Sequence, residues 1–208
     1  MDNTVIPLFA IPLFYTEVEP ISEQTKTYLK ELPFERLKVN NGWNSKCKCI
    51  LDTPPCVELK RSIMERVNHY ATEIIQINKD LEFYITNSWV IKHELGDWGQ
   101  QHIHTNSVFS GCVYIECDQT SGDIVFHKPL GLNNCISSTI DMQCWNWNIF
   151  NSKAWSVKPK NNSLVLFPSQ LPHSVNTNTS EIERYSLAFN VFVKGKIGSD
   201  DDLCELIL

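Results

Sequence analysis

The sequence of 208 residues lacks the features that direct a chain into a membrane or out of the cell. Its first residues, Met-Asp-Asn-Thr-Val-Ile-Pro, have neither the basic start nor the apolar run of a signal peptide. Nowhere do apolar residues form the run of roughly 18 that a transmembrane helix needs. We therefore expect a cytoplasmic protein that does not associate with membranes.

Basic residues and metal-type cysteine pairs are also scarce. The chain has 18 Lys and Arg against 24 Asp and Glu, a net charge of −6. Nucleic-acid binding needs clustered positive charge, so this balance disfavours a nucleic-acid partner. The eight cysteines include no Cys-x-x-Cys pair, and Cys47-x-Cys49 stands alone. We expect all eight to be free thiols, several of them small core residues.

No repeat or low-complexity linker divides the chain, whose length suits one domain. We expect a single domain over 1–208, with an N-terminal arm and supporting helices in 1–80, a β core in 81–195 and a tail in 196–208. Pro7 and Pro12 make residues 5–15 an edge strand or an extended arm. Helices are expected over 21–32, which Pro33 ends, and over 55–78, which carries one apolar stripe.

From about residue 83 the pattern changes to short β-type runs separated by turn residues such as Gly96-Asp97. The expected strands are 83–95, 101–104, 108–117, 123–127, 154–158, 163–167, 173–176 and 184–194. Such spacing is typical of a sandwich, barrel or jelly roll. Residues 129–153 fit neither period, and their Trp145, Trp147 and Phe150 predict a packed loop.

Three histidines are candidate metal ligands. In a strand over 101–104, His102 and His104 would project from one face, because alternate side chains share a face. His173 follows the buried run Leu164–Pro168 and begins a short strand. A structural reading, in which these are ordinary surface or core histidines, is the alternative for each of them taken alone.

The strand at 184–190 has one polar face. Arg184, Ser186, Ala188 and Asn190 alternate with Tyr185, Leu187 and Phe189, which form a core face. The polar face would line a cavity or, as the alternative, face water at a sheet edge. Arginine binds a carboxylate with a two-pronged fork, so Arg184 is a candidate carboxylate ligand, with the Ser186 hydroxyl beside it.

Together these elements match the requirements of a non-haem Fe(II) oxygenase. Such enzymes hold iron with a facial set of three protein ligands and leave the other positions open. A chelating keto acid can take two open positions, and its remote carboxylate then needs a cation deeper in the barrel. Arg184 is placed for that role.

The sequence resembles the 2-oxoglutarate/Fe(II)-dependent dioxygenases, and more narrowly a group from bacteria and phages within the prolyl-hydroxylase-like superfamily. The resemblance runs over nearly the whole chain. Its motifs are Pro7-Leu-Phe…Pro12-Leu-Phe, Gly42-Trp-Asn-Ser45, Ser88-Trp89, His102-Ile-His104, Ser110-Gly-Cys-Val-Tyr114, Leu164-Val-Leu-Phe-Pro-Ser169, His173-Ser-Val175, Arg184-Tyr-Ser186 and Phe189-Asn190.

The resemblance implies a mainly β protein with flanking helices on a double-stranded β-helix (jelly-roll) core. It implies Fe(II), 2-oxoglutarate and O2 as requirements. By position, His102 would be the first metal ligand and His173 the last. Arg184 and Ser186 would hold the distal carboxylate of 2-oxoglutarate, and Tyr114 would add a hydroxyl to the same site.

One departure concerns the middle ligand, because His104 stands where the family has Asp or Glu. A three-histidine site is chemically sound, since neutral imidazole suits iron. Alternatively, Asp97, Asp118 or Asp123 supplies a carboxylate from a nearby turn, or the position is open and the outcome changes, as in related halogenases. We favour three histidines because the strand pleat places His104 beside His102.

Two other functions compete with the oxygenase. A cupin-like three-histidine metalloenzyme would need no keto acid and therefore no Arg184-x-Ser186 pair. A non-enzymatic β-helix binding module would need no iron. The sequence does not identify the substrate, for which a protein side chain and a small molecule are both candidates. It does not indicate the oligomeric state either. Trp89 is expected in the core, and His93 and His127 match no motif.

Overall fold

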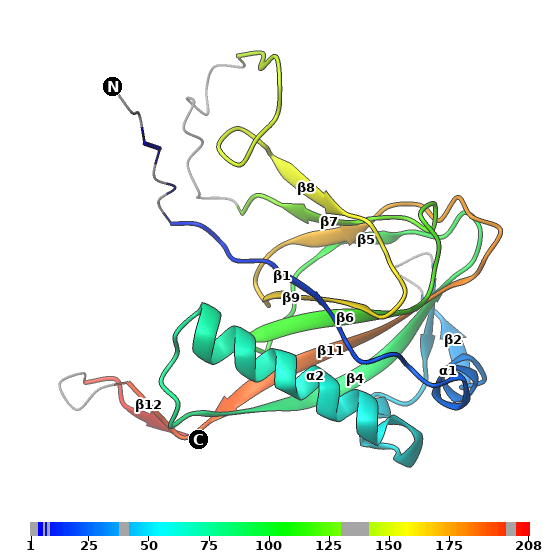
Figure 1. Ribbon diagram of the computed structural model, residues 1–208, viewed down its shortest axis with the longest axis horizontal. Helices are drawn as coiled ribbons and strands as arrows, with labels where there is room; N and C mark the ends of the chain where they lie inside the picture. The colour runs from blue at the N-terminus through cyan, green and yellow to red at the C-terminus, as the bar shows by residue number, and fades with distance from the viewer. Residues whose placement is uncertain (1–3, 6, 8, 38–41, 130–141, 199–202) are drawn as a thin grey trace.

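Two antiparallel β-sheets, one above the other, form the centre of the protein (Figure 1). The computed structural model describes residues 4–5, 7, 9–37, 42–129, 142–198 and 203–208. The larger sheet has the strand order β1-β9-β6-β11-β4-β3-β2 and the smaller one β5-β10-β7-β8. Strands far apart in the sequence are therefore neighbours, as in a jelly roll.

The larger sheet provides the wall on which most of the predicted site lies. Its strands are β1 (Phe14–Glu17), β2 (Phe34–Arg36), β3 (Trp43–Ser45), β4 (Glu82–His93), β6 (Phe109–Glu116), β9 (Ser163–Pro168) and β11 (Arg184–Lys194). β11 pairs with β4 along its whole length, with one irregularity after Asn190. This register places Arg184 opposite His93 and Asn190 opposite Asn87.

The smaller sheet covers the other side of the site. Its strands are β5 (Gly99–His102), β7 (Ile124–His127), β8 (Ala154–Val157) and β10 (His173–Val175). β10 lies between β5 and β7, so His173 is opposite His102 on one side and Phe126 on the other. The eight strands predicted from residue 83 onward are all present, with ends that differ by a few residues.

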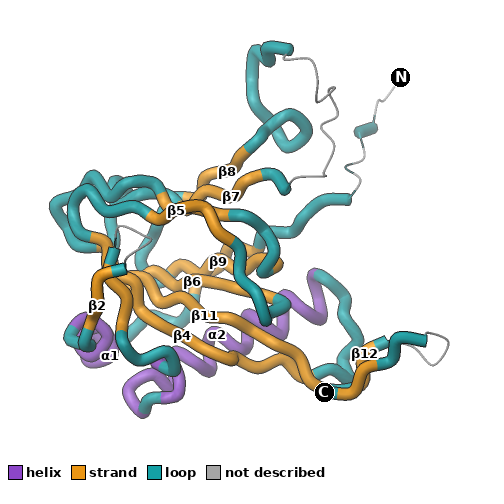
Figure 2. The backbone as a smooth tube through the Cα atoms, turned by 180° about the vertical axis from the view of Figure 1, so that it is seen from behind, coloured by secondary structure: helices purple, strands orange, loops and turns teal. Residues whose placement is uncertain are grey.

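The helices lie on the face of the larger sheet that points away from the smaller one (Figure 2). α1 (Glu23–Lys30) begins at Ser22, whose hydroxyl accepts the amide of Thr25. α2 (Val57–His69) buries a stripe of Leu59, Ile63 and Val67 in the main hydrophobic core. Both helices were predicted, and both are shorter than predicted.

The end of α2 shows why its predicted length was too great. After His69 the chain forms one π-helical turn over Tyr70–Ile74, closed by the Ile75 amide on the Tyr70 carbonyl. The apolar stripe continues through this turn, but the regular helical period does not. At the other end, Pro54–Cys56 form a 3₁₀ turn before the helix.

The two ends of the chain contain short strands, most of which were not predicted. The arm forms an edge strand as expected, but β1 starts only at Phe14, after Pro12. The short strands β2 and β3 in the N-terminal part were not predicted. The expected tail contains a small antiparallel pair, β12 (Lys196–Ile197) and β13 (Leu206–Ile207).

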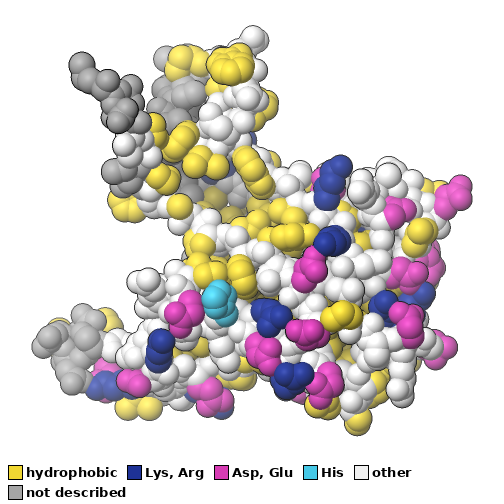
Figure 3. Space-filling view, in the orientation of Figure 1, with side chains coloured by type: hydrophobic (Ala, Val, Ile, Leu, Met, Phe, Trp, Pro, Cys, Tyr) yellow, Lys and Arg dark blue, Asp and Glu magenta, His cyan; other side chains and the backbone are white. Residues whose placement is uncertain are grey.

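The loop between β7 and β8 was predicted to be packed, and for its described part this is wrong. Residues 130–141 lie outside the described residues. Beyond them, Trp145 is 98% exposed and Trp147 60% exposed. Hydrophobic side chains gather on the part of the molecule raised above the sheets (Figure 3). Aromatic content alone therefore did not distinguish a packed loop from an exposed one.

The expectations for the cysteines and for membrane-spanning helices can be compared with the described residues. Seven cysteines are free, and Cys56 and Cys112 are buried, as expected of small core residues; Cys135 lies outside the described residues. Within the described part of the chain, no helix is long and apolar enough to span a membrane.

Candidate metal centre and co-substrate pocket

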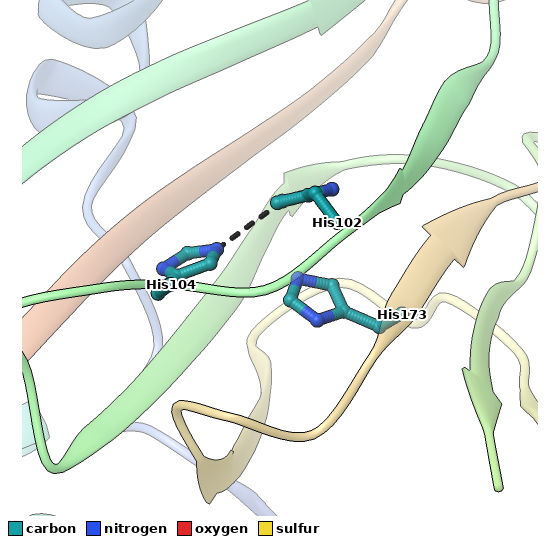
Figure 4. Close-up of side chains that lie close together, drawn as sticks. All are labelled: His102, His104 and His173. Carbon is teal, nitrogen blue, oxygen red and sulfur yellow. Dashed lines mark hydrogen bonds between the residues drawn. The ribbon is translucent and has the colours of Figure 1, made fainter. Parts of the chain in front are cut away.

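Three histidines converge in one cluster: His102 and His173 on the neighbouring strands β5 and β10, and His104 just beyond the end of β5 (Figure 4). His102 ends β5, and His173 begins the adjacent β10. His104 was expected on the same strand as His102, but the strand stops at His102. The His104 amide instead donates to the Ser169 carbonyl at 2.9 Å, and this bond holds the His104 backbone beside the end of β9.

The spacing of the three imidazoles suits one metal ion. One nitrogen from each ring lies within 4.8 Å of the others. The Nε2 atoms of His102 and His104 are 3.2 Å apart. Two nitrogens at about 2.1 Å from one metal, at a right angle, would be about 3.0 Å apart. Two facing lone pairs repel each other, so a shared cation between them would stabilise this arrangement.

The other nitrogen of each ring is occupied. The Nδ1 atoms donate to three oxygens: His102 to the Gln100 carbonyl at 2.9 Å, His173 to the Leu171 carbonyl at 2.9 Å, and His104 to Asn190 Oδ1 at 2.5 Å. Because these oxygens only accept, each Nδ1 carries the proton and each Nε2 keeps a free lone pair. Outer hydrogen bonds of this kind fix the tautomer of metal-binding histidines.

Burial keeps two of the ligand candidates neutral. Burial, and then the neighbouring His102, lower the pKa of His173 to about 3. Burial also lowers the pKa of His104, against the opposing hydrogen bond to Asn190. A neutral imidazole offers its lone pair without first losing a proton, so neither ring needs to be deprotonated to bind metal at neutral pH.

A chain of hydroxyl groups is hydrogen-bonded to Asn190, the partner of His104. Asn190 Oδ1 also accepts the Ser110 hydroxyl at 2.8 Å. Ser110 in turn contacts the Ser169 hydroxyl at 2.8 Å, and Ser107 donates to Ser169 at 2.7 Å. Asn190 belonged to the predicted polar face of β11, but the sequence did not indicate the serine network or its link to the metal candidate.

A cavity of about 470 Å³ opens beside the histidines, between the two sheets. β11 contributes Arg184, Ser186 and Ala188 to its lining, as the polar face of that strand predicted. Ile124, Phe167 and Val175 form an apolar wall from the other strands. The alternative of a solvent-facing edge is wrong, because β11 lies inside the larger sheet and Arg184 is only 2% exposed.

Arg184 is a buried cation with an incomplete set of partners. Its Nη1 donates to the Gly122 carbonyl at 3.2 Å, and its guanidinium lies 5.1 Å from the centre of the Tyr114 ring. Its Nε and the Tyr114 hydroxyl are buried without a hydrogen-bond partner. Unpaired buried polar groups are costly. A ligand carboxylate would satisfy both, so the residues present fit the distal end of a keto diacid.

Two sequence interpretations do not hold. Trp89 was expected in the core but lines the cavity, with its ring centre 6.0 Å from that of His104. A nearby carboxylate was an alternative to His104, but the metal-type cluster among the described residues consists of histidines alone. Asp97 instead pairs with Arg36 at 2.6 Å, Asp118 accepts the Ser180 hydroxyl, and Asp123 is not in the cluster.

The fold is shared with solved oxygenases. A prolyl-4-hydroxylase from Pseudomonas putida is 13% identical, with a TM-score of 0.57 over 88% of this chain and 94% of that one. An oxidoreductase of the 2OG-Fe(II) oxygenase family from Burkholderia pseudomallei is 14% identical, with a TM-score of 0.55 over 80% and 74%. HygX from Streptomyces hygroscopicus, solved with nickel and 2-oxoglutarate, is 9% identical, with a TM-score of 0.56 over 88% and 83%.

At such low identity these structures show the fold: the mainly β, double-stranded β-helix core with flanking helices is as predicted. A comparison with curated proteins found no match. The model of one sequence family, described as "Putative 2OG-Fe(II) oxygenase", matches residues 87–190, which is half of the chain and includes all three histidines and Arg184. The chain belongs to this 2OG-Fe(II) oxygenase family.

Proposed function

We propose that the protein is an Fe(II)- and 2-oxoglutarate-dependent dioxygenase that hydroxylates a protein side chain or a small molecule. His102, His104 and His173 would hold the iron, and Arg184 and Ser186 the distal carboxylate of 2-oxoglutarate, with Tyr114 beside them. The observation that carries the proposal is the set of three Nδ1-anchored imidazoles next to a cavity with a buried, incompletely paired arginine.

When bound, iron and 2-oxoglutarate supply the oxidising chemistry. The residues of the chain bind and orient. Three neutral imidazoles leave the full charge of the ion to attract an anionic co-substrate. Arg184 provides a charged fork for the far carboxylate. Phe167 and the other apolar residues of the cavity exclude water from the space between these two positions.

The remaining space determines where a substrate would bind. The β4–β11 register places Trp89 and Asn87 toward the Asn190 end of the cavity, away from Arg184. A substrate there would contact an indole ring and a side-chain amide close to the histidines. This combination suits a group with both an apolar body and a hydrogen-bonding function, as protein side chains and many metabolites have.

Calorimetry with nickel as a redox-inert substitute for iron tests the proposal. The wild-type protein should bind one nickel ion, and then 2-oxoglutarate, which should not bind without the metal. His173→Ala should lose metal binding. Arg184→Leu should keep the metal and lose the keto acid. His127→Ala is the matched control, because His127 is half-buried and bonded to Ser174 outside the cluster.

Two results would contradict the proposal and indicate the competing functions. Metal binding without any 2-oxoglutarate binding would favour a three-histidine metalloenzyme that uses no keto acid. Absence of metal binding in the wild-type protein would leave a β-helix binding module with structural histidines.

A further inference from the structure

Unsatisfied polar groups gather around Arg184, which lines one part of the cavity. Four buried side-chain nitrogen or oxygen atoms of the described residues lack a hydrogen-bond partner. Three of them come from adjacent strands of the larger sheet: His93 Nδ1 on β4, Arg184 Nε on β11 and the Tyr114 hydroxyl on β6. Such groups are rare in folded proteins, so three together indicate a missing ligand atom or atoms.

His93 had no role in the sequence interpretation, yet it occupies a defined place here. It is the last residue of β4, directly opposite Arg184 in the register, and it lines the cavity. Only 3% of it is exposed. A Cβ at Gly42 would lie 2.6 Å from His93 Cδ2 and 2.8 Å from its Nε2. The absence of a side chain at Gly42 therefore leaves the space that the imidazole fills.

The surroundings keep this imidazole uncharged. Burial first, and then the positive charges of Arg184 and Arg36, lower the pKa of His93 to about 3. A neutral imidazole has one N–H group and no charge to repel Arg184. It can therefore lie next to the guanidinium and donate a directional hydrogen bond to a ligand. A second cation at this position would also donate, but its burial beside Arg184 would carry a high electrostatic cost.

We infer that His93 is a further binding residue for the distal carboxylate of the keto acid, donating a hydrogen bond to a carboxylate oxygen beside Arg184. The inference rests on the proposed function. A carboxylate has two oxygens and about four lone-pair sites. The Arg184 fork uses two of them, and the Tyr114 hydroxyl and the His93 imidazole supply donors for the others. His93 then contributes to the choice of a diacid over a monoacid.

The test compares two keto acids on the nickel-loaded protein by calorimetry. 2-Oxoglutarate carries the distal carboxylate, whereas 2-oxopentanoate has the same carbon chain without it. His93→Leu removes the donor but keeps an apolar side chain of moderate size. We expect it to weaken 2-oxoglutarate binding roughly 10- to 100-fold, as for a hydrogen bond to a charged group, and 2-oxopentanoate binding less than 3-fold.

Two more variants guard against a purely structural effect. His93→Asn places an amide N–H near the position of Nδ1 and should restore much of the preference for the diacid. Gly42→Ala keeps the histidine but displaces its ring, and should reduce the preference as His93→Leu does. If His93→Leu does not fold, these two variants decide the question. His127→Leu is the control and should bind both acids as the wild type does.

An equal loss for both acids would make His93 a structural residue, and no loss for either would remove it from the site; each result overturns the inference. A wild-type protein that binds neither acid would overturn the proposed function as well. A wild-type protein that binds 2-oxoglutarate, together with an unchanged His93→Leu variant, would overturn the inference alone.

Discussion

Asn190 holds the unusual middle histidine of the metal centre, so its removal should weaken metal binding from a distance. Its Oδ1 accepts the His104 Nδ1–H at 2.5 Å and the Ser110 hydroxyl at 2.8 Å. In Asn190→Ala both donors lose their acceptor. The His104 ring would then be free to rotate or to change tautomer, and either change moves the Nε2 lone pair away from its two neighbours.

The expected size of the effect follows from other metal sites, where a hydrogen-bond partner holds the nitrogen of the histidine that does not bind the metal. The loss of one such partner costs about 10- to 100-fold in metal affinity. This corresponds to about 1.4–2.7 kcal/mol. Competition titration of cobalt(II) against a chromophoric chelator would measure the affinity. The visible spectrum of bound cobalt would show whether the ligand geometry changes at the same time.

A matched control lies directly across the β4–β11 pair. Asn87 is opposite Asn190 and also lines the cavity, but its side-chain oxygen accepts the Thr86 hydroxyl rather than a ligand histidine. Asn87→Ala should keep wild-type cobalt affinity, and Asn190→Asp, which retains the acceptor, should lose little or none. Wild-type affinity and spectrum in Asn190→Ala would refute the role of Asn190 and weaken the case for His104 as a ligand.

Three further predictions concern stability and the rejected ligand. Gly111→Ala should lower the free energy of unfolding by about 1–3 kcal/mol in chemical denaturation, because the new Cβ would lie 2.6 Å from the Phe189 ring. Asp97→Asn should lower stability by weakening the ion pair between the buried Asp97 carboxylate and the partly exposed Arg36, while leaving metal affinity unchanged; a large loss of metal affinity would revive the carboxylate alternative. The His93 pKa of about 3 lies below the ordinary 6.5 of the unfolded chain, so the unfolded state binds the extra proton. Stability should therefore fall as the pH drops from about 6.5 toward 3, by at most about 1.4 kcal/mol per pH unit. Urea denaturation at several pH values should show that the unfolding free energy of metal-free His93→Asn changes less steeply with pH than that of the wild type, by the equivalent of about one proton. An unchanged dependence on pH would contradict the neutral buried imidazole.

The β core could be predicted from the sequence because its signals are local. Alternation in 184–190 correctly separated the cavity face of β11 from its core face. The turn before β9 is also local in origin: Asn162 there has a φ of 64°, a left-handed conformation that asparagine tolerates. The three histidines could be grouped because their spacing resembles that of a known family, although the observed strand ends at His102 and does not reach His104 as predicted.

The errors came from features that depend on residues distant in the sequence. His93 alternates with Asn87, Trp89 and Ile91 on β4, so the face they share was visible in the sequence. That this face lies over the cavity depends on pairing with β11, almost a hundred residues later. For the same reason Trp89 was placed in the core. The exposure of Trp145 has no local signal either, since the sequence of an exposed aromatic loop and of a packed one can be alike.

The most direct test of the central claim is an anaerobic titration of the metal-free protein with Fe(II) and 2-oxoglutarate, followed by visible absorption. A keto acid chelated to Fe(II) gives a charge-transfer band that neither component gives alone. We predict that the wild-type protein develops this band at one iron and one 2-oxoglutarate per chain, and that His173→Ala and Arg184→Leu do not. Iron binding without the band would contradict the account.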